Sequence, residues 1–252
     1  MNKTEALHQY LLRLADTSLI LGQRMAEWCS KGPILEEDLA MTNISLDLFG
    51  QANFLLQYAA ETSNKGESVD SLAFGRSERE YYNYLMVEYP NGDFAQTFMR
   101  QFLYSSFALL QYEALCASPD NQLAAIAAKS LKEIKYHVRH SAQWVIRLGD
   151  GTEESHQRTQ AALDRLWSFT GNFFERNAVD RILEQEGVIS DITELENDWR
   201  KMVTGVLLNA TLTIPEDGYM QTGSLEARHT EHLGHILCEM QYLQRTYPDA
   251  VW

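Results

Sequence analysis

The chain has 252 residues, of which 45% are apolar, so it can bury a sizeable core and is too apolar to be disordered. Its net charge of −14 disfavours nucleic acid and anionic membrane surfaces as partners. No apolar run approaches the about 18 residues of a transmembrane helix, and the N-terminal residues "MNKTEALHQY" lack the apolar segment of a signal peptide. We therefore expect a cytoplasmic protein that binds neither nucleic acid nor membrane.

Helical periodicity runs through almost every long segment, and only five prolines and fourteen glycines interrupt it. These breakers predict helices at 4–30, 35–62, 77–88, 93–117, 121–148, 153–174, 177–186, 193–212 and 219–246. No alternating strand pattern stands out. The stretch 205–214 is ambiguous because it is rich in β-branched residues, and 61–71 is predicted to be a polar loop.

The segment 35–62 is apolar on more than one face, with side chains such as Leu39, Leu46 and Leu55. A helix of this kind is typical of the interior of a bundle. Long helices without an internal repeat favour a bundle over a solenoid of short repeats. The pattern therefore predicts an all-α fold with a single domain over 1–252.

Polar residues recur on the inward stripes of three predicted helices. The stripe on 35–62 carries Asn43, Asp47 and Gln51. The stripe on 121–148 consists of Ile126, Ser130, Glu133, His137, His140 and Trp144. The stripe on 219–246 consists of Leu225, His229, His232, Ile236, Met240 and Leu243. We therefore expect an acid, an acid with two histidines, and a histidine pair to face one interior.

Such an interior is typical of a carboxylate-bridged di-metal centre, in which two helices each supply Glu and two others each supply Glu-x-x-His. The motif occurs here as Glu5/His8, Glu153/His156 and Glu226/His229. The first two pairs fall in first helical turns, where Glu favours the helix dipole and a capping role is expected. Only the third lies near a stripe that is expected to face the core.

The predicted helix at 93–117 argues against a complete metal site. It contains no histidine, and its only acid past Asp93 is Glu113. Its inward stripe reads Phe98, Gln101, Phe102, Ser105, Ala108, Leu109 and Tyr112. A site without ligands from one helix would bind metal poorly, since the remaining buried carboxylates would repel each other.

Each candidate ligand also has a structural interpretation. Asp47 could be a buried hydrogen-bonding residue, and Glu133 with His137 could form an ion pair between successive turns. His229 and His232 could be core or interface histidines whose ring nitrogens already have partners.

Two further groups of residues are expected to be structural. The widely spaced Cys29, Cys116 and Cys238 are predicted to be buried free thiols in a reducing compartment. The aromatic cluster at 81–84 is expected to serve packing or a partner surface.

Five segments of the chain are distinctive when taken together. They are "LRLADTSLILGQRMAEWC" (12–29), "LEEDLAMTNISLDLFGQANFLLQYAAE" (35–61), "PNGDFAQTFMRQF" (90–102), "QLAAIAAKSLKEIKYHVRHSAQWVIRLGDGT" (122–152) and "HTEHLGHILCEMQYLQR" (229–245). In sequence, order and spacing they resemble the C-subunit family of bacterial phenylacetyl-CoA epoxidases. The resemblance covers essentially the whole chain.

The resemblance implies a ferritin-like four-helix bundle with flanking helices, within a multicomponent monooxygenase of aerobic phenylacetate degradation. That complex converts phenylacetyl-CoA into its ring-1,2-epoxide with O2 and electrons from NADPH. Its reductase holds FAD and an iron–sulfur cluster, and the related A subunit holds the di-iron centre and the CoA-ester site. The chain would be a non-catalytic partner of the A subunit, with the reductase and other subunits as further contacts and no cofactor of its own.

Residue by residue, the resemblance implies a degenerate metal site with no bound metal and no catalytic residue in this chain. Ser105 and Ala108 fall where catalytic relatives carry an acid and, three residues later, a histidine. The vestigial positions are Asp47, Ser105, Ala108, Glu133, His229 and His232.

Two alternatives remain at this stage. One is a self-sufficient di-metal oxidase or oxygenase that uses Asp47, Glu133, Glu226, His229 and His232. The other is an iron-storage or carrier bundle, whose signature would be assembly into a cage, because a fold does not by itself define a function.

Overall fold

The structure is a computed structural model that describes residues 1–63, 65–248 and 250, and every regular element in these ranges is a helix. The long helices are α1 (Lys3–Ala26), α2 (Leu35–Ser63), α5 (Phe94–Leu115), α6 (Asn121–Gly149), α7 (Glu153–Trp167) and α9 (Glu196–Asn209). The short ones are α3 (Val69–Phe74), α4 (Leu85–Glu88), α8 (Ala178–Gln185), α10 (Glu231–Met240) and α11 (Tyr242–Thr246). The all-α class is confirmed, whereas the ferritin-like bundle stays a prediction.

Short 3-10 helices complete the described secondary structure: η1 (Glu78–Glu80), η2 (Thr170–Phe174), η3 (Ile192–Leu195) and η4 (Ser224–Glu226). Within the same residues, no helix combines the length and the apolar content that crossing a bilayer requires.

The chain divides into two compact units, and the backbone passes between them several times. Unit 1 comprises Met1–Tyr89, Asn177–Glu186 and Gly223–Trp252, and unit 2 comprises Pro90–Arg176 and Gly187–Thr222. The single domain over 1–252 stays a prediction.

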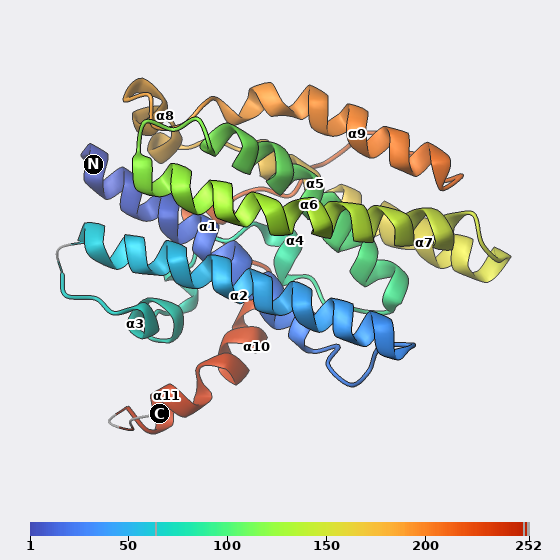
Figure 1. Cartoon of the computed structure of the whole chain (residues 1–252), viewed down its shortest axis with the longest axis horizontal. Coiled ribbons are helices and arrows are strands. Elements are labelled where there is room, and N and C mark those ends of the chain that lie inside the picture. The colour runs from blue at the N-terminus through green and yellow to red at the C-terminus, as the bar shows by residue number, and fades with distance from the viewer. Residues whose placement is uncertain (64, 249, 251–252) are drawn as a thin grey trace. The chain divides into compact units, whose positions relative to one another are not determined.

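Unit 1 is built on the antiparallel pair of α1 and α2, which lie side by side in Figure 1. Gly22 of α1 permits their close approach, since a Cβ there would lie 2.8 Å from the ring of Phe49 on α2. The Ser45 hydroxyl of α2 also donates to the Gly22 carbonyl at 2.8 Å. At the start of α1, Asn2 and Glu5 form a capping box, which confirms the capping role expected for Glu5.

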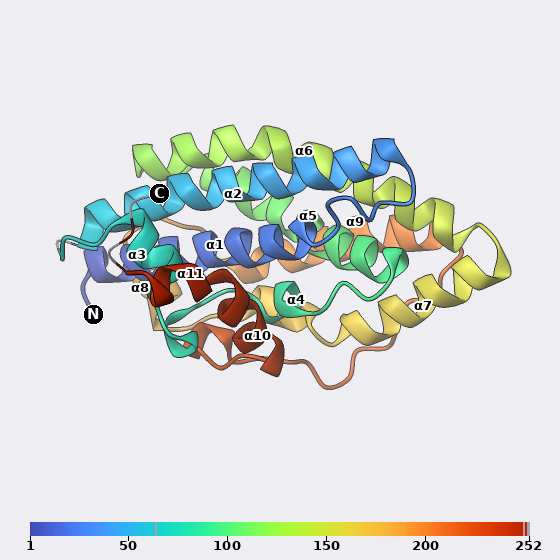
Figure 2. The ribbon, with the colours of Figure 1, turned by 90° about the horizontal axis from the view of Figure 1, so that it is seen from below.

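The remaining elements of unit 1 are short and pack around this pair. α8 and α4 contact α1, and α10 contacts α1, α4 and η1. Figure 2 shows α10 next to α4, in agreement with their contacts. Irregular chain at 81–84 and 227–230 connects these short helices, so side-chain contacts must fix their positions.

Unit 2 is built on the pair of α5 and α6, with α7 and α9 packed against them. Its interior is rich in aromatic rings. Phe107 stacks on Phe173 with ring centroids 4.7 Å apart, and Trp199 meets Phe174 at 5.6 Å. The Trp199 indole donates to the Leu103 carbonyl at 3.2 Å, so the ring is both packed and hydrogen-bonded.

Two predicted helices are wrong. The segment 77–88 contains only η1 and α4, separated by extended chain, and the segment 219–246 breaks into η4, α10 and α11. Gly223 and Ala227 adopt left-handed backbone conformations with φ of 109° and 54°, which cannot continue an α-helix. In the ambiguous stretch 205–214, α9 continues to Asn209 and no strand forms.

Several predictions of burial are also corrected. α2 exposes Leu39 and Leu46, so it is not buried all round, and Asn43 on the predicted inward stripe is exposed. The cysteines are free thiols, but Cys29 and Cys238 are exposed and Cys116 is half-buried.

Candidate functional site

The predicted inward stripe of α5 is buried, except for the half-buried Leu109. Ser105 and Ala108 lie on this stripe, with 1% and 2% of their surfaces exposed. The Ser105 hydroxyl donates to the Gln101 carbonyl one turn earlier. The Ser141 hydroxyl of α6 lies 3.5 Å from the Ser105 hydroxyl. Ala108 has no side-chain donor atom, so neither position supplies the acid or imidazole of a metal ligand.

The α6 stripe is partly as predicted. Ser130 and His137 are buried, whereas Glu133, the candidate carboxylate, is half-buried. On α2, Asp47 is half-buried and Gln51 is buried.

His229 and His232 do not share a helix. Thr230 caps the N-terminus of α10 and accepts a hydrogen bond from the His232 backbone N–H, so His229 precedes the helix and His232 lies in its first turn. The His232 ring meets Tyr89 edge-on, with ring centroids 5.5 Å apart. His229 and His232 therefore do not lie on one helical stripe, as the predicted histidine pair requires.

Glu226, the acid of the third Glu-x-x-His motif, lies in η4 and is exposed. Its carboxylate pairs with the exposed Arg228. Glu226 and His229 therefore have different partners and do not present a joint ligand pair.

Within each unit, the described residues contain no group of three His, Cys, Asp or Glu side chains placed to hold a metal ion. The six vestigial positions draw on both units: Asp47, His229 and His232 belong to unit 1, and Ser105, Ala108 and Glu133 belong to unit 2. Their assignment as the remains of one di-metal site stays a prediction.

The structure shows instead that His229 belongs to a buried polar network. Its Nδ1 lies 2.6 Å from Glu88 Oε1, and its Nε2 lies 2.8 Å from the Tyr81 carbonyl oxygen. The side chains of His229 and Glu88 are 1% and 0% exposed. Since a carboxylate and a carbonyl oxygen both accept hydrogen bonds, this geometry favours a doubly protonated ring. Both ring nitrogens are thereby engaged.

Electrostatics agree with that protonation state. Burial by itself would lower the pKa of His229, but the hydrogen bond and the charge of Glu88 outweigh it, so that the pKa lies above its ordinary value of 6.5. Glu88 is satisfied further by the backbone N–H and hydroxyl of Thr230, at 2.8 and 2.6 Å, and by the Asn83 amide at 2.8 Å. One carboxylate on α4 therefore anchors the chain segment that leads into α10.

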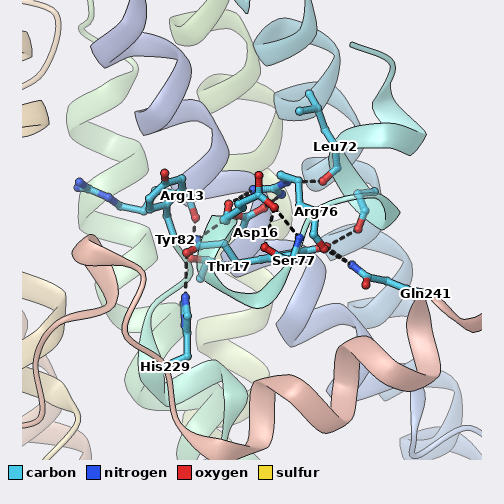
Figure 3. Close-up of polar contacts among 12 residues, drawn as sticks. Arg13, Asp16, Thr17, Leu72, Arg76, Ser77, Tyr82, His229 and Gln241 are labelled. Carbon is cyan, nitrogen blue, oxygen red and sulfur yellow. Dashed lines mark hydrogen bonds and ion pairs between the residues drawn. The ribbon is translucent and has the colours of Figure 1, made fainter. Parts of the chain in front are cut away.

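A second buried ion pair joins Asp16 of α1 to Arg76, as Figure 3 shows. Asp16 is 0% exposed and also accepts the Tyr82 backbone N–H at 3.0 Å. The Arg76 guanidinium donates to the carbonyls of Leu72 and Glu80, each at 2.6 Å. This pair fixes the turn between α3 and the extended chain that follows η1.

The C-terminal segment is fastened to the same place. The Gln241 amide donates to the Arg76 carbonyl at 2.8 Å and to the Tyr81 hydroxyl at 3.0 Å. That hydroxyl donates to the Ala73 carbonyl at 2.6 Å, and burial raises the pKa of Tyr81 to about 12, so the phenol remains neutral. Gln241 is itself buried, at the boundary of α10 and α11.

A third pair holds α8 against α1. Arg13 donates to both carboxylate oxygens of Asp180, at 2.6 and 3.2 Å, and both side chains are buried. The Asp180 carboxylate also accepts the Asn177 backbone N–H at 2.9 Å, as part of the capping box that starts α8.

The pairing of these buried charges does not follow from the sequence. A signal was present in "LLRLADTSLILG", because Arg13 and Asp16 interrupt an otherwise apolar stretch of the first helix. Buried charges of this kind need partners, but their partners lie 60 or more residues away, and a single sequence does not name them.

Unit 1 also has a cavity of about 710 Å³ beside the start of α1. Glu5, His8, Lys65, Glu67 and Arg76 lie among its lining residues, so it gathers both signs of charge. The His8 Nδ1 lies 2.9 Å from the Ala59 carbonyl, and its Nε2 lies 4.0 Å from Glu67. This mixture does not single out a class of ligand.

Taken together, the buried ion pairs of unit 1 fix the positions of its short segments. The chain belongs to the phenylacetic acid catabolic protein family, whose model matches residues 1–252. Within that class, the chain is similar to the C subunit of the 1,2-phenylacetyl-CoA epoxidase of Escherichia coli (strain K12). Identity is 46% over 246 residues, which is 98% of this chain and 99% of the relative. The resemblance found in the sequence is thereby confirmed.

Proposed function

We propose that this chain is a non-catalytic partner subunit of a multicomponent phenylacetyl-CoA 1,2-epoxidase in the cytoplasm. It would bind and support a catalytic di-iron A subunit during aerobic phenylacetate degradation. The observation that carries the proposal is similarity along almost the full length of both chains to the C subunit of such an enzyme.

The site geometry supports the non-catalytic part of the proposal. Ser105 and Ala108 supply no acid or imidazole, and both ring nitrogens of His229 already have protein acceptors. Glu226, which the di-metal oxidase alternative needs, is exposed and paired with Arg228. In the proposed complex, the di-iron centre belongs to the A subunit, and FAD and the iron–sulfur cluster belong to the reductase.

The partner role is tested by co-expression with the A subunit of the same epoxidase. We expect a stable hetero-oligomer in size-exclusion chromatography at micromolar concentration, because obligate interfaces often bury more than about 2,000 Å². If the two chains elute separately under these conditions, the proposed partner role is wrong.

The non-catalytic role is tested by metal analysis. The chain is expressed alone with iron and manganese supplied, and the metal content per chain is measured after desalting. We expect no stoichiometric metal. About two metals per chain would instead favour the self-sufficient di-metal oxidase, and assembly into a cage would favour iron storage.

A further inference from the structure

The N-terminal half of α2 and the residue before it present apolar side chains on the surface. Four of the ten large apolar side chains that are exposed among the described residues fall in a stretch of thirteen: Ile34, Leu35, Leu39 and Leu46. They are 54%, 71%, 53% and 60% exposed. Isolated exposed leucines are common, but a cluster of this kind is typical of an interaction site.

Leu35, Leu39 and Leu46 lie on one face of the helix, because their spacings of four and seven residues correspond to whole helical turns. Gly50 continues this face one turn further on. From Leu35 to Gly50 the face is about 22 Å long, at about 1.5 Å per residue. This length suits one helix of a partner packed along α2.

The open space at Gly50 is a second, independent indication that another helix packs on this face. A Cβ built on this half-buried glycine meets no atom within 4 Å, so the packing of this chain does not require a glycine there. Glycine in the middle of a helix is destabilising relative to alanine. A glycine on an outer face does, however, allow the backbone of another helix to approach closely. We call Leu35, Leu39, Leu46 and Gly50 the α2 face.

The charge of the segment indicates which kind of partner fits. Between residues 35 and 50 it carries Glu36, Glu37, Asp38 and Asp47 and no Lys or Arg. Acidic side chains in the first turn interact favourably with the helix dipole, so Glu36, Glu37 and Asp38 also stabilise α2 in the absence of a partner. In a two-fold contact with a second copy, however, these acidic segments would meet each other, and such a contact is electrostatically unfavourable.

We infer that the α2 face docks a helix of the A subunit that presents apolar side chains flanked by Lys and Arg. This inference rests on the proposed function and names the surface through which that function operates. The leucines supply apolar area, Gly50 sets the close approach of the two helices, and the acidic flanks orient the partner.

The test compares purified full-length variants in titrations with the purified A subunit. Leu46→Asp places a charge in the centre of the α2 face, and we expect its Kd to rise by about 100-fold or more, as for a central hot-spot residue. The matched control is Leu208→Asp on α9, since Leu208 is 62% exposed, close to the 60% of Leu46. This control should bind like the unmodified chain.

A second pair of variants separates close approach from loss of apolar area. Gly50→Ala adds one methyl group to the α2 face, and we expect about 10-fold weaker binding. Gly205→Ala on α9 is its control, because a Cβ there also meets no atom within 4 Å. Thermal melts of all variants report folding separately, and added salt should weaken binding of the unmodified chain, as acidic flanks predict.

The outcomes are distinguishable. If the unmodified chain does not bind the A subunit, the proposed function is wrong. If it binds and Leu46→Asp binds equally well, the function stands and the α2 face is not the docking surface. If the chain alone forms a dimer that Leu46→Asp dissociates, the occupant is a second copy and the inference about the A subunit is overturned.

Discussion

The two units hold their irregular segments by different means. In unit 1, buried ion pairs fix the chain: Asp16 with Arg76, Arg13 with Asp180, and Glu88 with His229. In unit 2, the chain at η2 is held by aromatic rings, where Phe173 contacts Phe107 and Trp199. Buried charge pairs therefore fix short segments in unit 1. In unit 2, aromatic burial fixes η2, and ion pairs such as Arg176 with Asp191 are more exposed.

The difference shows how each unit responds to a substitution. A buried charge that loses its partner is strongly destabilising, whereas a ring replaced by a smaller apolar side chain leaves a cavity whose walls can partly relax. A pH dependence is expected in unit 1, because His229 titrates there with a raised pKa.

The largest expected effect comes from Asp16→Ala. This change leaves the buried Arg76 guanidinium without its carboxylate and removes the acceptor of the Tyr82 N–H. Breaking a buried ion pair from one side costs about 3–5 kcal/mol. We expect a decrease of that size in the free energy of unfolding in urea.

Two comparisons show whether this cost comes from the unpaired charge. Glu154→Ala removes an exposed ion pair with Arg158 and should leave the stability almost unchanged. The double variant Asp16→Leu with Arg76→Met should recover much of the loss, because replacing both charges by apolar groups is often nearly neutral. If the double variant were as unstable as Asp16→Ala, loss of shape and of the carbonyl contacts, rather than the buried charge, would explain the effect.

His229→Gln should lower the free energy of unfolding by less than Asp16→Ala, and by an amount that depends on pH. The folded state raises the pKa of His229, so its protonated form contributes stability that is fully present below about pH 6.5 and is lost as the pH rises through the folded pKa. A charged hydrogen bond of this kind contributes about 1.5–3 kcal/mol. We therefore expect unmodified chain and variant to differ most at pH 6 and less at pH 9 in urea unfolding.

His235 provides the control for this experiment. It lies on the same helix, α10, but is exposed. His235→Gln should leave both the stability and its pH dependence nearly unchanged. A constant difference between the unmodified chain and His229→Gln across the pH range would show that His229 is not charged in the folded state.

In unit 2, Phe173→Leu should have a smaller effect that does not change with pH. Leucine retains most of the buried apolar area but loses the ring contacts with Phe107, Phe174 and Trp199. Such ring pairs contribute about 0.5–1.5 kcal/mol beyond area burial. We expect a loss of about 1 kcal/mol in urea at both pH 6 and pH 9. A clear pH dependence here would remove the contrast between the units.

The same contrast explains what could be predicted from the sequence. Local signals determine where long helices begin and end, and α2 and α6 start and stop within one residue of the predicted ranges. The segment 219–246 has helical spacing, yet its first part adopts irregular chain because His229 and Thr230 bond to Glu88. That contact spans more than 140 residues of sequence, so no local pattern contains it.

The candidate site was predictable where it depends on residue identity and not where it depends on tertiary contacts. The absence of ligands at Ser105 and Ala108 is a property of residue identity, which the sequence states directly. The partners of His229 are a property of tertiary structure, so spacing alone suggested a pairing with His232 that the fold does not make. The family resemblance covered the whole chain because it depends on many positions rather than on one contact.

The smallest expected change in the free energy of unfolding comes from alanine substitutions at two glycines in the helices of unit 1. The two substitutions should change it in opposite directions. Gly50→Ala should raise the free energy of unfolding of the isolated chain by about 0.5–1 kcal/mol, because the added methyl group has open space and a helix favours alanine. Gly22→Ala should lower it, since the new Cβ would lie 2.8 Å from the Phe49 ring and would push α1 and α2 apart. Urea unfolding of the chain alone measures both.

A glycine that destabilises its own helix and that no intramolecular contact requires is best explained by a neighbour outside the chain. If Gly50→Ala were destabilising in the isolated chain, Gly50 would serve the fold itself, and the argument for close approach of a partner helix would lose its basis.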